Sequence, residues 1–452
     1  MSAAGPARHR SSFWAGFATR ERLGWVVYDW ANSAFVLCVV TVLGSAYFVG
    51  VFQAAARHGG ATVGEEPALV LAGLPVTAEA AWSFVIAAAA LLVAVCSPFL
   101  GAIADAWGAR KRFLQAFCAL GVAATAALWW GGPWWWVGLL ILLGIVGFEG
   151  GNVYYNAFLP DIAGGRDEDM VSATGYAAGY VGGVLVLIAA LAWFVPPRGD
   201  IHHAFLLIAL WWGGFALVTF ALLRERPGRP PAGGGGTLRQ AARELARTVG
   251  SVRRYRNAGL FLLAFLLYND GIATLISNVT PYALQNIYLD RSLTRRIGLE
   301  EMIGAIILVQ VVAFPGAMLC GWLATRLGDK RALYLMLAVF TGVVAYGQVA
   351  QVVRELYVLA ALIGLVLGGA QAVSRSLYSR FVPAGRNAEF FSFFALSQKF
   401  SAMFGPLFYG LSVLLTGSTR LALLSLVVFF VAGGAVLSLV NVQQGQAEAA
   451  RR

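Results

Sequence analysis

The sequence predicts an all-α membrane protein with twelve transmembrane helices in two pseudo-symmetric six-helix halves. Composition is the first observation, because 59% of the 452 residues are hydrophobic and only 12% are charged, whereas a soluble domain carries about 25% charged residues. Length is the second, since about 20 apolar residues cross the hydrocarbon as one helix. The third is that the apolar segments are continuous, which favours helices over the alternating strands of a membrane β-barrel.

Twelve apolar segments reach the length of a membrane span. They are centred near residues 38, 91, 121, 145, 182, 212, 270, 312, 341, 366, 402 and 430. We expect them to divide the chain into five parts, namely a cytoplasmic tail (1–22), an N-terminal bundle (23–224), a cytoplasmic linker (225–256), a C-terminal bundle (257–441) and a second cytoplasmic tail (442–452).

The linker contains a basic amphipathic segment over residues 238–256, which follows a stretch rich in Pro and Gly. One face of this segment is apolar, and Arg239, Arg243 and Arg247 share another. We expect either a helix lying on the anionic headgroups of the inner leaflet or a simple solvated tether.

The net charge of +11 is best explained by membrane topology. If the twelve spans alternate, most basic loops fall on one side of the membrane, which is then cytoplasmic together with both termini. The loop between the seventh and eighth spans is an exception, because it carries Arg291, Arg295 and Arg296.

The two halves carry the same motifs in the same order. One motif follows the second span and recurs after the eighth, as Gly101-x-x-x-Asp105-x-x-Gly108-x-Arg110-Lys111 and Gly321-x-x-x-Thr325-x-x-Gly328-x-Lys330-Arg331. Another recurs as Tyr155-x-x-Phe158-x-Pro160 and Tyr378-x-x-Phe381-x-Pro383. This repetition predicts parallel halves related by an axis along the membrane normal.

Ionisable side chains lie inside several apolar segments. A charge in hydrocarbon is costly, so such residues usually face a water-filled cavity or a partner charge. Helical spacing places amide and hydroxyl side chains on the same faces as these charges. We therefore predict a solute or proton pathway lined by Asp29, Asn32, Glu149, Asn152, Asn156, Asn269, Asp270, Gln371, Arg375 and Lys399.

Each charge also has a structural interpretation that the sequence leaves open. Asp29 can hold helices together through hydrogen bonds, and Glu149 can form a static ion pair with Arg375. Asp270 can cap backbone N–H groups at a local helix break. Lys399 can extend its ammonium group to a membrane face if it lies near one.

The repeated loop motif is predicted to control conformation without contacting the solute. Its glycines let helix ends approach closely, its aspartate can cap a neighbouring helix, and its basic residues lie beside anionic headgroups. Thr325 replaces the aspartate in the second copy, where we expect a weaker gate. The predicted gate residues are Gly101, Asp105, Gly108, Arg110 and Lys111, with Gly321, Gly328, Lys330 and Arg331 in the second copy.

Sequence patterns of enzymes are missing. The histidines at positions 9, 58, 202 and 203 do not have the spacing of a zinc-protease helix, and the chain carries no P-loop motif. We therefore expect no catalytic residue, no metal, no cofactor and no built-in ATP motor.

Several separate motifs resemble those of a known family. They are Tyr28-Asp29-Trp30-Ala31-Asn32-Ser33-Ala34-Phe35, Tyr154-Tyr155-Asn156-Ala157-Phe158-Leu159-Pro160-Asp161-Ile162-Ala163, Tyr268-Asn269-Asp270-Gly271 and Ser374-Arg375-Ser376-Leu377-Tyr378-Ser379-Arg380. With the repeated loop motif, they resemble the major facilitator superfamily and, within it, the vacuole-effluxer-like branch. That branch includes bacterial "unknown major facilitator" proteins and a fungal autophagy-linked vacuolar amino-acid exporter.

The resemblance covers residues 22 to 440 and implies a secondary transporter of a small solute, working by alternating access in a bacterial inner membrane. Amino-acid efflux is the first expectation. Arg375 or Lys399 would hold a carboxylate, and Asp29 or Asp270 an ammonium group. A carboxylate shielded from water can also bind and release a proton, so Asp29, Glu149 and Asp270 are candidates for proton coupling.

Two alternatives remain at this point. One is an exporter of hydrophobic drugs or lipids, and the other is a membrane receptor or scaffold that keeps the fold without transport. We expect a monomer whose partners are its solute, protons and anionic lipid headgroups, with no nucleic acid.

Overall fold

The computed structural model describes residues 17–59, 61–63, 66–71, 73–163, 167–194, 199–225 and 255–400, and between 404 and 450 all residues except 406, 407, 410, 411, 413–415 and 417. In these ranges, eleven helices are long and apolar enough to cross a membrane. They coincide with eleven of the twelve predicted spans, and the twelfth, centred near residue 402, lies in the incompletely described stretch. The chain is thus an integral, multi-pass membrane protein, and the prediction of an all-α membrane fold is confirmed.

The N-terminal half holds the first six spans. Its helices are α1 (Arg20–Phe35), η2 (Val36–Val42), α2 (Leu43–Gly59), α3 (Ala78–Trp107), α4 (Arg110–Ala127), η3 (Leu128–Trp130), α5 (Trp134–Ala157), α6 (Leu159–Ile162), α7 (Asp167–Trp193) and α8 (Ile201–Leu222). The C-terminal half contains α10 (Arg256–Asn286), α11 (Leu299–Leu327), α12 (Asp329–Gly347), α13 (Val353–Ser379), α14 (Asn387–Phe400), α16 (Thr419–Ser425), α17 (Val427–Leu439) and α18 (Val442–Ala450).

A small antiparallel sheet connects the first two spans and was not predicted from the sequence. It is formed by β1 (Ala61–Val63), β2 (Glu66–Leu71) and β3 (Leu74–Thr77), with β2 in the centre. Gly73 lies between β2 and β3 with φ +82, a backbone conformation that glycine adopts without strain. The strands are only three to six residues long, which is too short for a clear alternating pattern.

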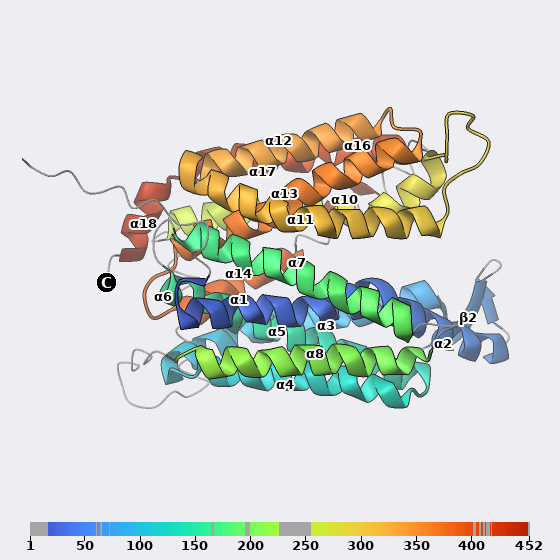
Figure 1. The fold of residues 1–452 in the computed structure, drawn as a ribbon, viewed down its shortest axis with the longest axis horizontal. Helices are drawn as coiled ribbons and strands as arrows, with labels where there is room; N and C mark the ends of the chain where they lie inside the picture. Colours follow the sequence, from blue (N-terminus) through green and yellow to red (C-terminus); the bar gives the residue numbers. More distant parts are fainter. Residues whose placement is uncertain are drawn as a thin grey trace, which may run out of the picture.

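Figure 1 shows the halves side by side, with their long helices roughly parallel to the long axis of the molecule. Between the halves, α7 packs on α11 and α13, and α14 packs on α3 and α5. We call the end that carries α6, α18 and the start of α1 the α6 end, and the opposite end, with the three strands, the sheet end.

Glycines on α7 bring this helix against α1. A Cβ at Gly175 would lie 2.5 Å from the Asp29 carboxylate, and one at Gly179 or Gly182 would collide with Ser33 or with the backbone of Trp30. Small residues at such spacing allow close approach of membrane helices. The α1–α7 contact therefore fixes the depth and direction of Asp29.

The first span is not a uniform α-helix. Its middle, η2, is π-helical, and the N–H of Leu43 donates to the carbonyl of Cys38. The Thr41 hydroxyl donates to the carbonyl of Val36 at 3.0 Å. Such insertions into α-helices occur often at functional sites.

The chain returns to the bundle after the last span. Residues 442–450 form α18, and Glu448 accepts hydrogen bonds from the backbone and side-chain nitrogens of Asn257, at 3.2 and 2.9 Å. The predicted C-terminal tail is thus largely a docked helix. The predicted amphipathic linker helix lies almost entirely in residues 226–254, outside the described residues.

Candidate functional site

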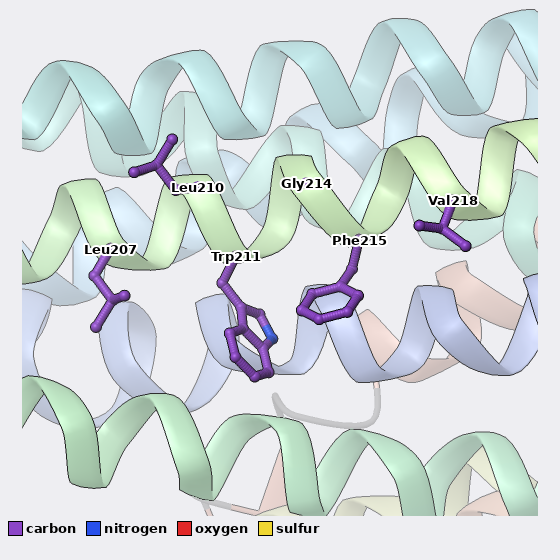
Figure 2. A pocket seen from close by; sticks show the side chains of 6 residues that line it. All are labelled: Leu207, Leu210, Trp211, Gly214, Phe215 and Val218. Atoms are coloured by element: carbon purple, nitrogen blue, oxygen red, sulfur yellow. The ribbon is translucent and has the colours of Figure 1, made fainter.

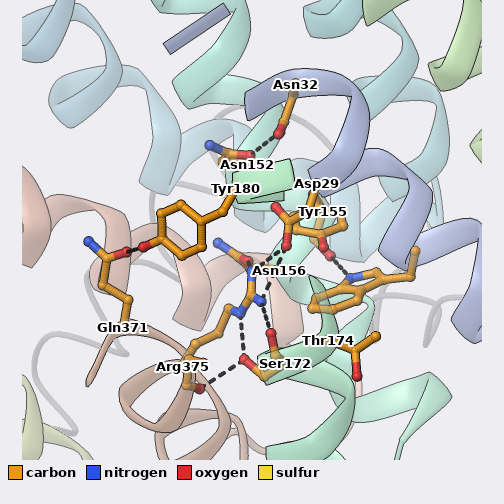
Figure 3. Close-up of polar contacts among 12 residues, drawn as sticks. Asp29, Asn32, Asn152, Tyr155, Asn156, Ser172, Thr174, Tyr180, Gln371 and Arg375 are labelled. Atoms are coloured by element: carbon orange, nitrogen blue, oxygen red, sulfur yellow. Dashed lines mark hydrogen bonds and ion pairs between the residues drawn. The ribbon is translucent and has the colours of Figure 1, made fainter. Parts of the chain in front are cut away.

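The candidate site is centred on Arg375, whose guanidinium crosses from the C-terminal half into the N-terminal half (Figure 3). Its Nε donates to the Ser172 hydroxyl and one Nη to the Ser172 carbonyl, both at 2.9 Å. Both Nη atoms lie 3.4 Å from one carboxylate oxygen of Asp29, and one also donates to the Asn156 side chain at 3.2 Å. Arginine has five N–H donors, and these contacts account for all of them.

Aromatic rings enclose the same guanidinium. The Arg375 Cζ lies 4.3 Å from the ring centroid of Tyr176, 4.6 Å from Trp25 and 5.7 Å from Tyr155. Trp25 stacks on Tyr155 at 4.4 Å and donates its ring N–H to the Tyr155 carbonyl at 2.9 Å, which fixes its orientation. Cation–π attraction adds to the hydrogen bonds, so the cluster binds both the charge and the flat shape of a guanidinium.

This cluster is buried and lies nearer the α6 end than the middle of the bundle. Arg375 is 2% and Asp29 8% exposed. At 1.5 Å per residue, Asp29 lies about 13 Å along α1 from its first residue, and Ser172 about 8 Å along α7. The ion pair therefore ties the halves together on the α6-end side of the middle of the bundle.

A second polar layer lies one helical turn nearer the sheet end. The Asn32 side chain donates to Asn152 at 3.0 Å, joining α1 to α5. The Tyr180 hydroxyl is 3.5 Å from the Gln371 side-chain oxygen, joining α7 to α13 across the two halves. Six predicted pathway residues are thus brought together in two adjacent layers, namely Asp29, Asn32, Asn152, Asn156, Gln371 and Arg375.

The structure does not join Asp270 to this cluster through any described contact. Asp270 is fully buried, and one carboxylate oxygen accepts the backbone N–H of Gly405 at 2.8 Å. Asp270 thus bonds a backbone N–H, as the capping interpretation expected, but this N–H belongs to a distant segment, and α10 continues through Asp270 without the expected break. Asn269 precedes it in α10 and is half-buried.

The remaining predicted charges are Glu149 and Lys399. Glu149 lies half-buried in α5, and the described ion pair of Arg375 is made with Asp29. Lys399 belongs to α14, but its side chain lies outside the described residues.

The first copy of the loop motif contacts α14 across the interface. Asp105 accepts the backbone N–H of Glu389 at 3.0 Å, which is the helix-capping contact expected from the sequence. Arg110 lies 3.6 Å from Asp105 and 2.8 Å from Asp161, and donates to the Ala157 carbonyl at 3.0 Å. These contacts hold the α3–α4 turn, α6 and the start of α14 together at the α6 end.

The other residues of the first copy support the turn. Gly108 adopts φ +58, and the Lys111 backbone N–H donates to the Glu225 carboxylate at 2.6 Å. Burial raises the pKa of Glu225, although the Lys111 N–H opposes this shift.

The second copy is built differently. A Cβ at Gly321 would collide with Ala173 of α7, and Gly328 adopts φ +87. The Thr325 hydroxyl donates to its own helix, at Trp322, and Lys330 donates to the carbonyls of Ser438 and Val440. The neighbouring Arg331 is exposed.

An arginine that was not predicted closes this side of the interface. Arg380, which directly follows α13, lies 2.7 Å from Asp169 of α7 and 2.8 Å from Asp329 of α12. Asp169 also accepts a hydrogen bond from the Ser376 hydroxyl at 2.6 Å, and the Ser379 hydroxyl donates to the Glu168 carboxylate. Asp169 and Asp329 are 1% and 4% exposed. The second copy has Thr325 where the first has Asp105, and a buried charge network around Arg380 joins the halves there instead.

Overpacking the close contact at Gly101 is expected to separate the halves at the α6 end. In Gly101→Ala the new Cβ would lie 2.7 Å from the Ala388 carbonyl oxygen of α14, and overpacking costs about 1–3 kcal/mol. Spin labels at the exposed positions Arg112 and Arg326 should then report a larger population of long distances. Gly342→Ala is the matched control, because nothing lies within 4 Å of its Cβ position. Equal distance distributions in the two variants would contradict this prediction.

An apolar groove lies along α8 and is lined by side chains of that helix, of which Trp211 and Phe215 contact Trp30 of α1 (Figure 2). Trp211 stacks on Trp30 at 5.3 Å, and its ring N–H donates to the Trp30 carbonyl at 3.2 Å. An apolar groove on the surface of a membrane helix suits lipid chains better than a polar solute. Its lining residues are Leu207, Leu210, Trp211, Gly214, Phe215 and Val218.

Several known proteins resemble this chain in sequence or in fold. A family model described as "Vacuole effluxer Atg22 like" matches residues 18–450. The chain is 30% identical to an uncharacterized MFS-type transporter, YxiO, of Bacillus subtilis (strain 168), over 93% of this chain and 95% of that protein. It is 27% identical to autophagy-related protein 22-1 of Penicillium rubens, over 62% of this chain and 50% of the fungal protein. The crystal structure of the human organic anion transporter MFSD10 matches 96% of this chain and all of that one, with a TM-score of 0.65 at 16% identity.

Proposed function

Because the chain belongs to the Atg22-like vacuole effluxer family and is a secondary transporter of the major facilitator superfamily, we propose that it exports amino acids by alternating access. The description of the family supports efflux. The polar cluster supports a small charged solute, because the chain places a buried carboxylate and a buried guanidinium on opposite halves. Hydrophobic export would call for an apolar chamber, which this charged cluster does not provide.

The observation that carries the proposal is the Asp29–Arg375 pair across the interface between the halves. In alternating access, two halves rock around a site and expose it to each side in turn. An ion pair that joins the halves must break in one of the two states, so it can respond to solute. The N–O separations of the Asp29–Arg375 pair are 3.4 Å, longer than the 2.7 and 2.8 Å of the ion pairs that Arg380 makes.

The closed α6 end fits one of these two states. Contacts of Asp105 and Arg380 join the halves there. We place this end in the cytoplasm, because the basic loops of the sequence fall on this side. The protein then loads its solute when the α6 end opens, in a bacterial inner membrane, as a monomer. Reporter fusions after residues 225 and 450 should both be cytoplasmic.

We further propose that Asp29 couples transport to protons. When Arg375 leaves, the Asp29 carboxylate loses its partner charge, and a proton would neutralise it. Transport driven by a pH gradient then requires Asp29 to bind and release a proton. Exchange of solute at equal concentrations on both sides does not require this proton transfer.

Asp29→Asn is expected to abolish concentrative transport while retaining part of the exchange. The substitution keeps the shape of the side chain and removes its ability to carry a proton. The measurement compares pH-driven accumulation with counterflow of labelled amino acids in proteoliposomes. Wild-type transport that persists without a pH gradient and moves no protons would contradict coupling. A wild-type protein that exchanges no amino acid would contradict the proposed solute class.

A further inference from the structure

The groups that hold the Arg375 guanidinium all belong to the N-terminal half. Trp25 and Asp29 come from α1, and the remaining groups come from α5 and α7, namely Tyr155, Asn156, Ser172 and Tyr176. Among the described residues, the C-terminal half contributes Arg375 and the Ala372 carbonyl, which accepts the Ser172 hydroxyl at 2.8 Å. The N-terminal half therefore contains a receptor for a planar cation, and we call these six residues the guanidinium receptor. Figure 3 labels Asp29, Tyr155, Asn156 and Ser172 of this set.

The receptor is complete for a guanidinium group. It supplies an acceptor for every N–H of the guanidinium and aromatic rings around it. Gly175 forms part of its wall, since a Cβ there would lie 2.8 Å from the Trp25 ring and 3.3 Å from an Arg375 nitrogen. Its shape is set mainly by packing among α1, α5 and α7, while the Ser172 hydroxyl also donates to the Ala372 carbonyl of α13 at 2.8 Å.

Opening of the α6 end changes the occupant of this receptor. Since Arg375 is carried by α13, separation of the halves withdraws it, while Asp29 and the other acceptors stay with the N-terminal half. A buried carboxylate without a counter-ion is costly. A second cation, entering from the opened end, can restore the lost contacts.

We infer that the solute carries a guanidinium or ammonium group and that this group replaces Arg375 in the guanidinium receptor. Arg375 is then an internal stand-in for the cationic side chain of a basic amino acid. This inference rests on the proposed amino-acid transport and narrows it to cationic amino acids, with arginine preferred because it fills every acceptor.

Arginine and citrulline provide the sharpest comparison. They have nearly the same shape, but the ureido group of citrulline is neutral and replaces one N–H₂ group by a carbonyl oxygen. In either orientation that oxygen would face an acceptor, which is Asp29 with Asn156 or Asp29 with the Ser172 carbonyl. Sites built to bond a donor strongly reject analogues that lack it.

The first test measures counterflow in proteoliposomes with labelled arginine, lysine, citrulline and leucine. We expect the order arginine, lysine, then citrulline, with arginine at least about 10-fold faster than citrulline, because charge-assisted hydrogen bonds are lost in citrulline. Leucine or citrulline exchanging as fast as arginine would overturn the inference and leave amino-acid transport intact. If no amino acid exchanges, the proposed solute class is wrong. The second test then shows separately whether the guanidinium receptor binds a guanidinium cation.

The second test uses the thermal stability of purified Arg375→Ala, in which the receptor lacks its occupant. Free guanidinium at millimolar concentration should raise the melting temperature of this variant, and equimolar sodium or urea should not. Arg354→Ala removes an exposed arginine of the same helix and is the control, with no guanidinium effect expected. Equal shifts in both variants would overturn the inference. If Arg375→Ala does not fold, the inference is tested by the wild-type protein alone, through the ratio of its arginine and citrulline exchange rates.

Discussion

Arg375→Met is expected to abolish solute flux while the protein remains in the membrane. The substitution removes the guanidinium and leaves the buried Asp29 carboxylate without its partner in the closed state. Removing one member of a buried ion pair costs about 3–5 kcal/mol. A change of that size shifts the balance between the two transport states by at least about 100-fold, since each 1.4 kcal/mol is a factor of ten. The state in which the α6 end is closed is then too rarely populated to support turnover.

Flux and protein abundance must be measured together for this variant. Arg354→Ala, at an exposed position of the same helix, should retain both. The double variant Asp29→Asn/Arg375→Met should be more abundant than Arg375→Met, because it leaves no uncompensated charge, and the cycle measures the coupling between the two residues. Normal flux in Arg375→Met would contradict the proposed role, and loss of flux only in proportion to abundance would support a purely structural role.

Arg380→Ala is expected to give the largest loss of stability. It removes a guanidinium shared by Asp169 of α7 and Asp329 of α12, both of which are buried. The same reasoning on buried ion pairs gives a cost of about 3–5 kcal/mol. Because Asp169 belongs to the opposite half, the halves should also separate at the α6 end.

The melting temperature of the purified protein and the distance between spin labels at Arg112 and Trp322 test this prediction. Arg326→Ala, at an exposed position near the same end, is the control and should behave like the wild type. Adding Asp169→Asn and Asp329→Asn to Arg380→Ala should recover part of the stability. A melting temperature for Arg380→Ala equal to that of the control would show that the network contributes little.

The spans were predictable because hydropathy is a local average over some twenty residues. Residue spacing also placed Asp29 beside Asn32, and Arg375 one turn from Gln371, because helical periodicity is regular. The pairing of Asp29 with Arg375 was not predictable, since the two residues are 346 positions apart. Helix rotation and packing between halves decide which polar faces meet.

The residues that were missed resemble ordinary features of membrane helices. Arg380 lies at the end of a span, where a basic residue normally indicates a cytoplasmic loop. Its partner Asp169 lies in the first turn of α7, where an acidic residue usually stabilises the helix dipole. Trp25 and Tyr176 are typical of aromatic packing. Only the motif around Ser374–Arg380, which the family resemblance had singled out, pointed toward Arg380.

The π-helical segment η2 divides the first span into two α-helical parts. Below it, α1 is fixed against α7 by glycine contacts and against α5 by the Trp25 and Asn32 hydrogen bonds. Above it, α2 leads into the sheet, and the widened turn interrupts the regular backbone ladder that would transmit bending downward. The π-helical turn therefore separates the part of the first span that carries Asp29 from the part that leads into the sheet.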